Sequence, residues 1–165
     1  MPASLCSAPR IRRVRRQDLE AIYAIERSVF EKPYPPAYLE LLSMLTDHFL
    51  VATCSGQVAG YAVAVIVEEN VCHVLSIAVA PGFQGHGIGS RLLRSLLRGC
   101  CSGGAATAML EVNYVNYRAQ RFYVRHGFFY LTMLPRYYGK DHAIIMLNPE
   151  PCTGRGEVSS FRRTG

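Results

Sequence analysis

The sequence predicts an α/β chain of the α+β kind, in which about seven strands and about four helices form one domain. Residues 58 to 67 are nearly all apolar, which is typical of a strand buried on both faces. In residues 88 to 98, apolar side chains recur at every third or fourth position, which indicates an amphipathic helix. With 165 residues, half of them hydrophobic and 18% charged, the chain is long enough to bury one core.

The first third of the chain is predicted to form a strand and two helices. Residues 1–9, rich in Ser, Ala and Pro, predict a flexible leader. A short strand at 11–14 is basic, which indicates either a solvated edge or a patch that docks on nucleic acid. A helix then opens at Asp18, three prolines break the chain at 32–36, and a second short helix occupies 38–45. The basic run consists of Arg10, Arg12, Arg13, Arg15 and Arg16.

Strand patterns dominate from residue 49 onward. Residues 49–53 and 58–67 flank a turn and predict a hairpin, and a further strand covers 74–79. The strand at 107–114 follows the helix at 88–98, so we expect it to run parallel to the strand before that helix. A helix at 116–125 ends at Gly127, and strands at 128–134 and 143–147 complete the domain. The polar segment 149–165 predicts a flexible tail.

The stretch from His73 to Arg98 carries the clearest functional signal. Gly85, Gly87 and Gly89 separate a strand from the start of a helix. Bare backbone amides and the positive end of a helix dipole suit a phosphate or pyrophosphate. The loop lacks the Gly-Lys-Ser/Thr ending of a P-loop and the acidic residue that follows a dinucleotide fingerprint. The alternative interpretation is a flexible turn between strand and helix.

The spacing Gln-x-x-Gly-x-Gly at 84–89 resembles the acyl-coenzyme-A signature of the GNAT superfamily of N-acetyltransferases. Further segments are similar to its N-terminal protein acetyltransferase branch, which includes RimI-like enzymes and NatA catalytic subunits with their archaeal counterparts. The resemblance covers about 10–148 and implies an acetyltransferase domain there. It also implies a single mixed, mostly antiparallel central sheet with a parallel central strand pair. The matching residues are Leu110, Glu111, Val112, Asn116, Phe122, Tyr123, Gly127, Phe128, Arg136, Tyr137, Tyr138, Gly139, Asp141 and Ala143.

The same resemblance implies acetyl-coenzyme A as the acetyl donor, without a metal. Backbone groups of Ile77 and Val79 would lie along the donor, the glycine loop would hold the pyrophosphate, and Asn116 would hold the pantetheine arm. Asn116 is equally suited to cap a helix. His86 could touch phosphate or be a bystander. The expected cofactor-binding residues are Ile77, Ala78, Val79, Gln84, Gly85, His86, Gly87, Ile88, Gly89, Ser90, Asn116 and Tyr123.

Acetyl transfer to an amine needs a group that accepts the amine proton and one that protonates the departing thiolate. Glu111, in an apolar strand, is expected as a water-mediated general base, and the alternative is a carboxylate that pairs with an arginine. Tyr123 is expected as general acid, and the alternative is core packing beside Phe122. An α-amine has a pKa of about 7.7 to 8.0 and lysine one of about 10.4, so an N-terminus is the easier nucleophile.

The acceptor side is predicted from two segments. In relatives, the loop between the first two helices lines the first side-chain pocket, and here it contains Phe30, Glu31, Pro33 and Tyr34. Alternatively, its prolines only turn the chain. Tyr137 and Tyr138 would close over the first peptide units. His73 is expected at the surface, and Cys72 is near enough to the donor strand in sequence to be checked as a nucleophile.

These expectations predict an N-alpha-acetyltransferase that works by direct attack in a ternary complex. A lysine or small-amine acetyltransferase of the same fold is the alternative, and a non-catalytic acyl-coenzyme-A sensor or a basic RNA-binding module belongs to another class. Expected partners are protein N-termini or nascent peptides, the ribosome or a ribosomal protein, and an auxiliary subunit. The net charge of +6 suits an anionic ligand. We expect a cytoplasmic monomer or weak dimer without a membrane partner.

The six cysteines show no metal-ligand spacing. Most are therefore expected to be small buried hydrophobic residues or unpaired thiols. The neighbouring Cys100 and Cys101 leave a vicinal disulfide as the alternative.

Overall fold

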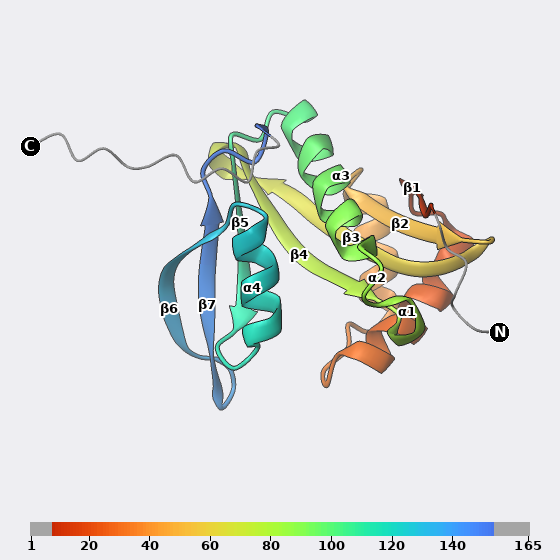
Figure 1. Cartoon of the computed structure of the whole chain (residues 1–165), viewed down its shortest axis with the longest axis horizontal. Coiled ribbons are helices and arrows are strands. Elements are labelled where there is room, and N and C mark those ends of the chain that lie inside the picture. Colours follow the sequence, from red (N-terminus) through yellow and green to blue (C-terminus); the bar gives the residue numbers. More distant parts are fainter. Residues whose placement is uncertain (1–7, 154–165) are drawn as a thin grey trace, which may run out of the picture.

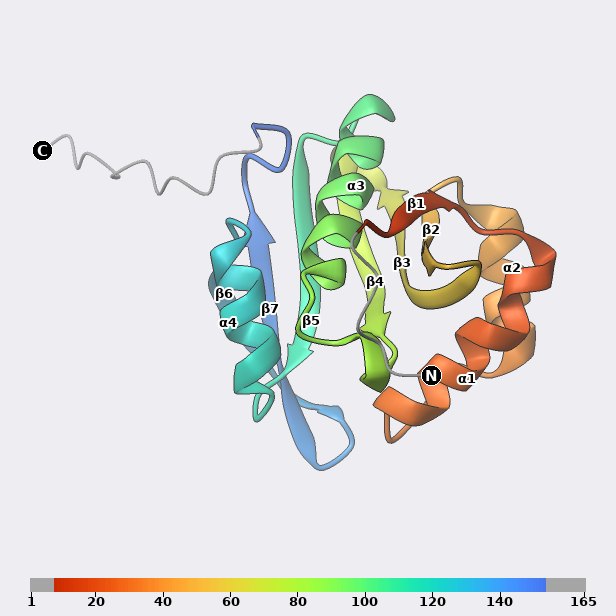
Figure 2. The same cartoon turned by 45° about the vertical axis from the view of Figure 1, so that its right-hand side comes forward.

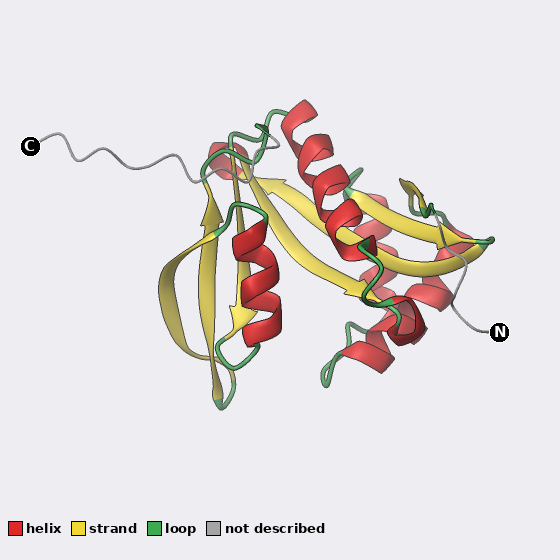
Figure 3. Ribbon diagram, in the orientation of Figure 1, coloured by secondary structure: helices red, strands yellow, loops and turns green. Residues whose placement is uncertain are grey.

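The computed structural model describes residues 8–153, in which seven strands form one sheet that is covered by four helices (Figure 1, Figure 3). Residues 1–7 of the predicted leader and most of the predicted tail lie outside the described residues. The predicted element order is confirmed, with boundaries that shift by a few residues. The elements are β1 (Arg10–Arg13), α1 (Leu19–Val29), α2 (Pro36–Leu45), β2 (Phe49–Cys54), β3 (Gln57–Val67), β4 (Val71–Val79), α3 (Ile88–Ser102), β5 (Thr107–Asn113), α4 (Tyr117–Arg125), β6 (Phe129–Tyr138) and β7 (Asp141–Asn148).

The sheet has the strand order β1-β2-β3-β4-β5-β7-β6. Its neighbouring strands run antiparallel except for β4 and β5, which are parallel as predicted. Helix α3 connects these two strands, and such a crossover places them parallel. The mixed, mostly antiparallel sheet with one parallel pair is therefore confirmed.

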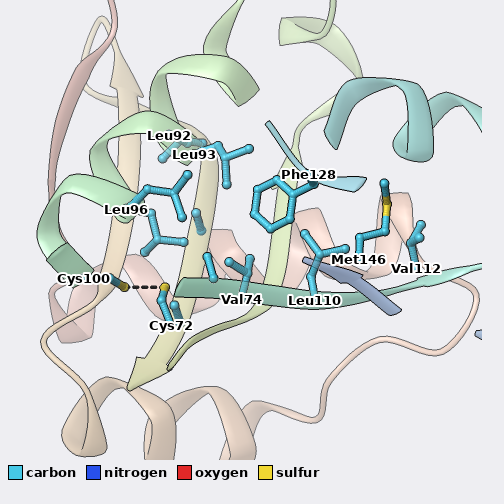
Figure 4. Close-up of a cluster of buried hydrophobic side chains, with 14 of the residues drawn as sticks. Cys72, Val74, Leu92, Leu93, Leu96, Cys100, Leu110, Val112, Phe128 and Met146 are labelled. Carbon is cyan, nitrogen blue, oxygen red and sulfur yellow. Dashed lines mark hydrogen bonds between the residues drawn. The ribbon is translucent and has the colours of Figure 1, made fainter. Parts of the chain in front are cut away.

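Helices cover both faces of the sheet (Figure 2). On one face, Leu92 and Leu96 of α3 pack on Ala62 and Ala64 of β3, and Phe122 of α4 packs against the same cluster. Figure 4 shows Leu92 and Leu96 in this cluster. On the other face, α1 and α2 pack on the alternate side chains of β3, which include Tyr61. Strand β3 is thus buried on both faces, which explains its nearly continuous apolar sequence.

Strands β4 and β5 separate soon after they meet. Their parallel pairing joins Val71–His73 to Thr107–Met109, and both strands continue beyond it as they diverge (Figure 1). The rest of β4 is paired with β3 on its other side, and β5 is paired with β7. One edge of β4, up to Val79, therefore has no partner strand among the described residues.

The N-terminal arginines have acidic partners. Arg12 donates to both carboxylate oxygens of Asp18, at 2.7 and 2.9 Å, and this bond lowers the pKa of Asp18. Arg13 pairs with Asp47, and Arg16 pairs with Glu40. Arg12 thus fixes the start of α1, whereas the exposed pairs add little stability. The nucleic-acid interpretation of this run stays a prediction.

The cysteines depart from expectation. Cys101, in the last turn of α3, forms a disulfide with Cys152, across a Cα–Cα distance of 5.7 Å. The alternative of a vicinal Cys100–Cys101 disulfide is wrong, because Cys100 is buried beside Cys72 with 2.6 Å between their Sγ atoms (Figure 4). The hydrogen bond that the Cys72 thiol donates to Cys100, together with burial, raises the pKa of Cys72. Cys72 is therefore unsuited to act as a nucleophile.

Replacing both Cys101 and Cys152 with Ser is expected to lower the melting temperature by about 10 °C. The disulfide closes a loop across a sequence separation of 51 residues, and a loop of that length contributes about 4 kcal/mol through the unfolded chain. Differential scanning calorimetry measures the shift, with Ser102→Ala, at the next position of α3, as a control. Equal melting temperatures for the double variant and the unmodified protein would contradict the expectation.

Candidate active site

The edge of β4 that no strand of the described residues pairs with begins after His73, where β4 and β5 diverge. Backbone groups of β4 face outward along this edge. The carbonyl oxygen of Leu75 accepts a hydrogen bond from the hydroxyl of Tyr34 (3.3 Å), and that of Val79 accepts one from the side-chain amide of Gln84 (3.0 Å). Both donors come from outside the sheet.

The pairing of β4 with β3 is regular from Ser76 to Val79 and shifts at Leu75. Since backbone groups alternate in direction along a regular strand, Ile77, two residues before Val79, faces the same open edge as Val79. An extended, amide-containing ligand could pair with it.

The sequence predicts that Ala78 binds the cofactor together with Ile77 and Val79, but Ala78 has a different place in the fold. It pairs with Tyr61 of β3, and its side chain belongs to the buried cluster under α1 and α2. Ala78 therefore supports the strand, and Ile77 and Val79 supply the groups at the open edge.

The glycine loop joins β4 to α3. Gly85 and Gly87 have positive φ angles of 81° and 76°, and Gly87 is the residue before the first turn of α3. Such angles favour glycine. A Cβ atom on Gly89 would lie 3.6 Å from the ring of Phe122, which is an ordinary van der Waals distance, so the packing of α3 on α4 does not require glycine at this position. The loop therefore has the bare backbone and the helix N-terminus that suit a phosphate.

The side chains around the loop have distinct roles. Gln84 braces the loop through its hydrogen bond to β4, and Arg118 of α4 donates to the side-chain Oε1 atom of Gln84 at 3.4 Å. Arg118, which the sequence analysis missed, brings positive charge to the loop. Ile88 is buried in the core, so it can offer a ligand only its backbone amide. His86 is exposed and bonds to the backbone of Gln84, whereas Ser90 is half-buried.

Glu111 and His73 form a pair on the face of the sheet opposite to α3. Glu111 alternates with the buried Leu110 and Val112 of β5. Its Oε2 atom lies 2.7 Å from Nε2 of His73, which stands on β4 where the two strands still pair. The partner of Glu111 is thus a histidine and not an arginine, and His73 is more than the surface residue we expected. Both side chains are mostly buried.

Tyr123 lies on α4, and its ring packs on Phe122 and Phe128 with centroid distances of 5.2 and 5.7 Å. Burial and the nearby Tyr138 raise the pKa of Tyr123, so its hydroxyl stays protonated. Asn116 caps α4 by accepting a hydrogen bond from the backbone of Ala119 at 3.1 Å, which confirms its capping role.

A tyrosine hairpin, Tyr137 and Tyr138 at the turn between β6 and β7, lies beside the Glu111 pair. The two rings meet edge to face with a centroid distance of 4.9 Å. Burial, then Tyr137 and Glu111, raise the pKa of Tyr138 to about 12. Burial is also the main cause that raises the pKa of Tyr34 to about 12, with contributions from Tyr138 and Tyr137. A Cβ atom on Gly139, the residue after Tyr138, would lie 4.0 Å from Nζ of Lys32, so the loop between α1 and α2 reaches the tyrosine hairpin.

The loop between α1 and α2 holds the other predicted acceptor residues. Phe30 packs against the core, Pro33 is half-buried, and Glu31 is exposed to solvent. The structure therefore brings together Tyr34, Tyr123, Tyr138 and Glu111, along with Tyr137. It leaves Glu31 and His86 at the periphery.

Other features of the described residues lie apart from this group. A hollow of about 570 Å³ lies between α1 and the turn from β2 to β3, and contains none of the predicted site residues. In residues 8–153, no cluster of three or more His, Cys, Asp or Glu side chains could hold a metal ion. Across the same range, no helix has the length and apolar character needed to span a membrane.

Comparison with known proteins gives consistent matches. The profile described as "Acetyltransferase (GNAT) family" matches residues 19–128. An uncharacterized N-acetyltransferase of Methanocaldococcus jannaschii is 37% identical over 145 residues, which cover 86% of this chain and 92% of that protein. The [ribosomal protein bS18]-alanine N-acetyltransferase of Escherichia coli is 32% identical, covering 80% of this chain and 91% of its own.

A solved structure matches the fold over most of its length. The crystal structure of Ard1 from Thermoplasma volcanium superimposes with a TM-score of 0.82 and 31% sequence identity, and the match covers 87% of this chain and 98% of that chain. The residues matched by the family profile, 19–128, include the glycine loop, His73 and Glu111.

Proposed function

The chain belongs to the GNAT acetyltransferase family, and on that premise we propose that it transfers an acetyl group from acetyl-coenzyme A to the α-amine of protein N-termini. One arrangement carries the proposal. The Glu111–His73 pair and the tyrosine hairpin lie beside the open edge of β4, where an acyl donor would bind. In this proposal Glu111 accepts the proton of the amine, and the tyrosine hairpin forms a wall of the peptide site next to the expected position of the thioester.

The donor side uses backbone groups and the glycine loop. Ile77 and Val79 offer hydrogen-bonding groups to the pantetheine arm, and a backbone amide near the thioester oxygen would stabilise the charge that develops there. The amides of residues 85–89 and the start of α3 would bind the pyrophosphate, with Arg118 close by. These residues hold the donor in place and do not react.

The proton transfers are assigned to Glu111 and Tyr123. As the neutral amine attacks the thioester carbonyl, Glu111 accepts a proton from it through a water molecule. His73 holds the Oε2 atom of Glu111 and orients the carboxylate. The C–S bond breaks as the amide forms, and Tyr123 donates its proton to the departing thiolate. Because the pKa of Tyr123 is raised, this donation is uphill; coenzyme A leaves as the thiol, and the tyrosinate then takes up a proton from water.

The acceptor is proposed to be a protein N-terminus, such as that of a ribosomal protein or another nascent chain. The tyrosine hairpin and the half-buried Tyr34 would close over the first peptide units, and an α-amine needs little help to deprotonate. Two relatives support this choice: the E. coli enzyme is named for an alanine of ribosomal protein bS18, and the Thermoplasma structure is of Ard1.

A peptide panel tests the proposed function. Each peptide carries a different first residue and an internal lysine, and is offered with a free or a blocked N-terminus. Release of coenzyme A is followed with a thiol reagent. We expect turnover on free N-termini, at rates that depend on the first residue. Equal turnover on blocked peptides would contradict the proposal and favour a lysine acetyltransferase.

The pH dependence follows from the amine and the tyrosines. We expect kcat/KM to rise up to about pH 8, as the α-amine loses its proton, and then to stay level to about pH 10. The plateau follows because the pKa values of Tyr34 and Tyr138 are raised to about 12, above the usual value near 10, so these hydroxyls keep their protons. A pH–rate profile that falls between pH 8 and pH 10 would contradict this expectation.

A further inference from the structure

Glu26 is a carboxylate inside the apolar stripe of α1, and it is only 1% exposed. One of its oxygens accepts a hydrogen bond from the backbone N–H of Tyr34 at 2.7 Å. The other accepts one from the hydroxyl of Tyr61 and lies 3.4 Å from the hydroxyl of Ser76. The hydroxyls of Tyr61 and Ser76 are themselves 2.7 Å apart. Glu26 thus connects α1 with the following loop and with strands β3 and β4.

Stability alone does not explain a carboxylate at this position. Its hydrogen-bond partners among the described residues are two hydroxyls and an amide, none of them basic. Burial raises the pKa of Glu26, which means that the fold disfavours its charge. A buried carboxylate without a cationic partner costs free energy that an apolar side chain would not. Its hydrogen bonds must therefore serve another purpose.

The bond to Tyr34 is the one that reaches the site. Tyr34 is held at both ends, since its N–H donates to Glu26 and its hydroxyl donates to the carbonyl of Leu75 on β4. Leu75 lies two residues before Ile77, on the open edge of the same strand. Glu26 thus fixes the distance between the loop that would line the first side-chain pocket and the strand that would hold the donor.

We propose that Glu26 is a positioning residue that holds the α1–α2 loop at the correct distance from the donor strand, and so shapes the pocket for the first residue of the peptide. The proposal rests on the proposed function. It assigns Glu26 no contact with the reacting atoms. The expected consequence is an effect on peptide binding that is separate from acetyl-coenzyme A binding.

Steady-state kinetics of Glu26→Ala test the proposal. We expect the KM for peptide to rise about tenfold or more, because a small misplacement of binding groups weakens productive binding. The KM for acetyl-coenzyme A should stay within about twofold, since its binding groups are on β4, the glycine loop and α4. Glu26→Gln should restore most of the peptide affinity. Its amide oxygen can accept from Tyr34, and its NH₂ can donate to the hydroxyls of Tyr61 and Ser76.

Asp18 provides the matched control at the opposite end of α1. It is also buried, and it accepts bonds from Arg12 and from the backbone N–H of Arg15. Asp18→Ala should lower the melting temperature as Glu26→Ala does, but leave the KM for peptide unchanged. Should Glu26→Ala fail to fold, Tyr61→Phe removes one donor to Glu26 and should raise the peptide KM by a smaller factor.

Hydrogen exchange separates this proposal from the proposed function. The amide proton of Tyr34 should exchange at least about tenfold faster in Glu26→Ala than in the unmodified protein, and should stay protected in Glu26→Gln. An unchanged exchange rate in Glu26→Ala would overturn the proposal whether or not the protein acetylates peptides. An unchanged peptide KM in Glu26→Ala, or an equal rise in Asp18→Ala, would also overturn it. No acetylation by the unmodified protein would overturn the proposed function alone.

Discussion

Glu111→Gln is expected to lower kcat/KM for peptide acetylation by about 10²- to 10³-fold, while the affinity for coenzyme A stays unchanged. Glutamine has nearly the same shape as glutamate but cannot accept the amine proton, and general-base catalysis contributes a factor of this size. The affinity should be kept because Glu111 lies on β5, whereas the groups assigned to the donor lie on β4, the loop and α4. Steady-state kinetics and calorimetric titration with coenzyme A measure the two effects.

His73→Ala distinguishes a base from a mere structural pair. It removes the bond to Glu111 Oε2 but leaves the carboxylate, so its effect on kcat/KM should be smaller than that of Glu111→Gln. If Glu111 served only as the partner of His73, the two variants would lower kcat/KM by the same factor. Full activity of Glu111→Gln at pH 7 would contradict the assignment of Glu111 as general base.

Tyr123→Phe is expected to lower kcat by about 10- to 100-fold with little change in the melting temperature. The variant keeps the ring that packs on Phe122 and Phe128 and removes only the hydroxyl assigned to protonate the thiolate. Single-turnover kinetics measure the chemical step, and calorimetry measures the stability. Tyr130→Phe, on the exposed strand β6, is a control with the same chemical change.

The outcome separates the two roles of Tyr123. A reduced kcat at an unchanged melting temperature supports the general-acid assignment. Packing alone would leave kcat unchanged, because phenylalanine packs as tyrosine does, and that result would contradict the assignment.

The order of the elements was readable from the sequence because the decisive stretches have clear periodicity. Strand β3 is nearly all apolar after Gln57 since helices cover both of its faces, and α3 repeats its leucines at helical spacing. The extent of β6 was not readable. It continues past Pro135 to Tyr138, which is allowed because β6 is an edge strand and a proline there breaks no ladder that the sheet needs.

The site was predictable as far as it depends on residue type and local spacing. Gly85 and Gly87 lie in the predicted loop between strand and helix, and Glu111 lies in the predicted strand, β5. The pairing of His73 with Glu111 depends on the register of two parallel strands, 38 positions apart in sequence, which no local pattern encodes. The Cys101–Cys152 disulfide was missed for the same reason.

Glu26 had a signal that was available in the sequence. It lies four residues after Ile22 and four before Phe30, so it is an acidic residue inside an apolar stripe. A charged residue at such a position is expected to be buried and to have specific partners. The identity of those partners depends on the tertiary structure, since Tyr61 and Ser76 come from other strands.

The central claim is that the open edge of β4 and the Glu111 pair act on the α-amine of a protein N-terminus. Tandem mass spectrometry tests it on one peptide that begins with alanine and contains a single lysine, incubated with acetyl-coenzyme A and the unmodified protein. We predict one acetyl group, located on the first residue, and none after incubation with Glu111→Gln. An acetyl group on the lysine, with the α-amine left free, would contradict the account.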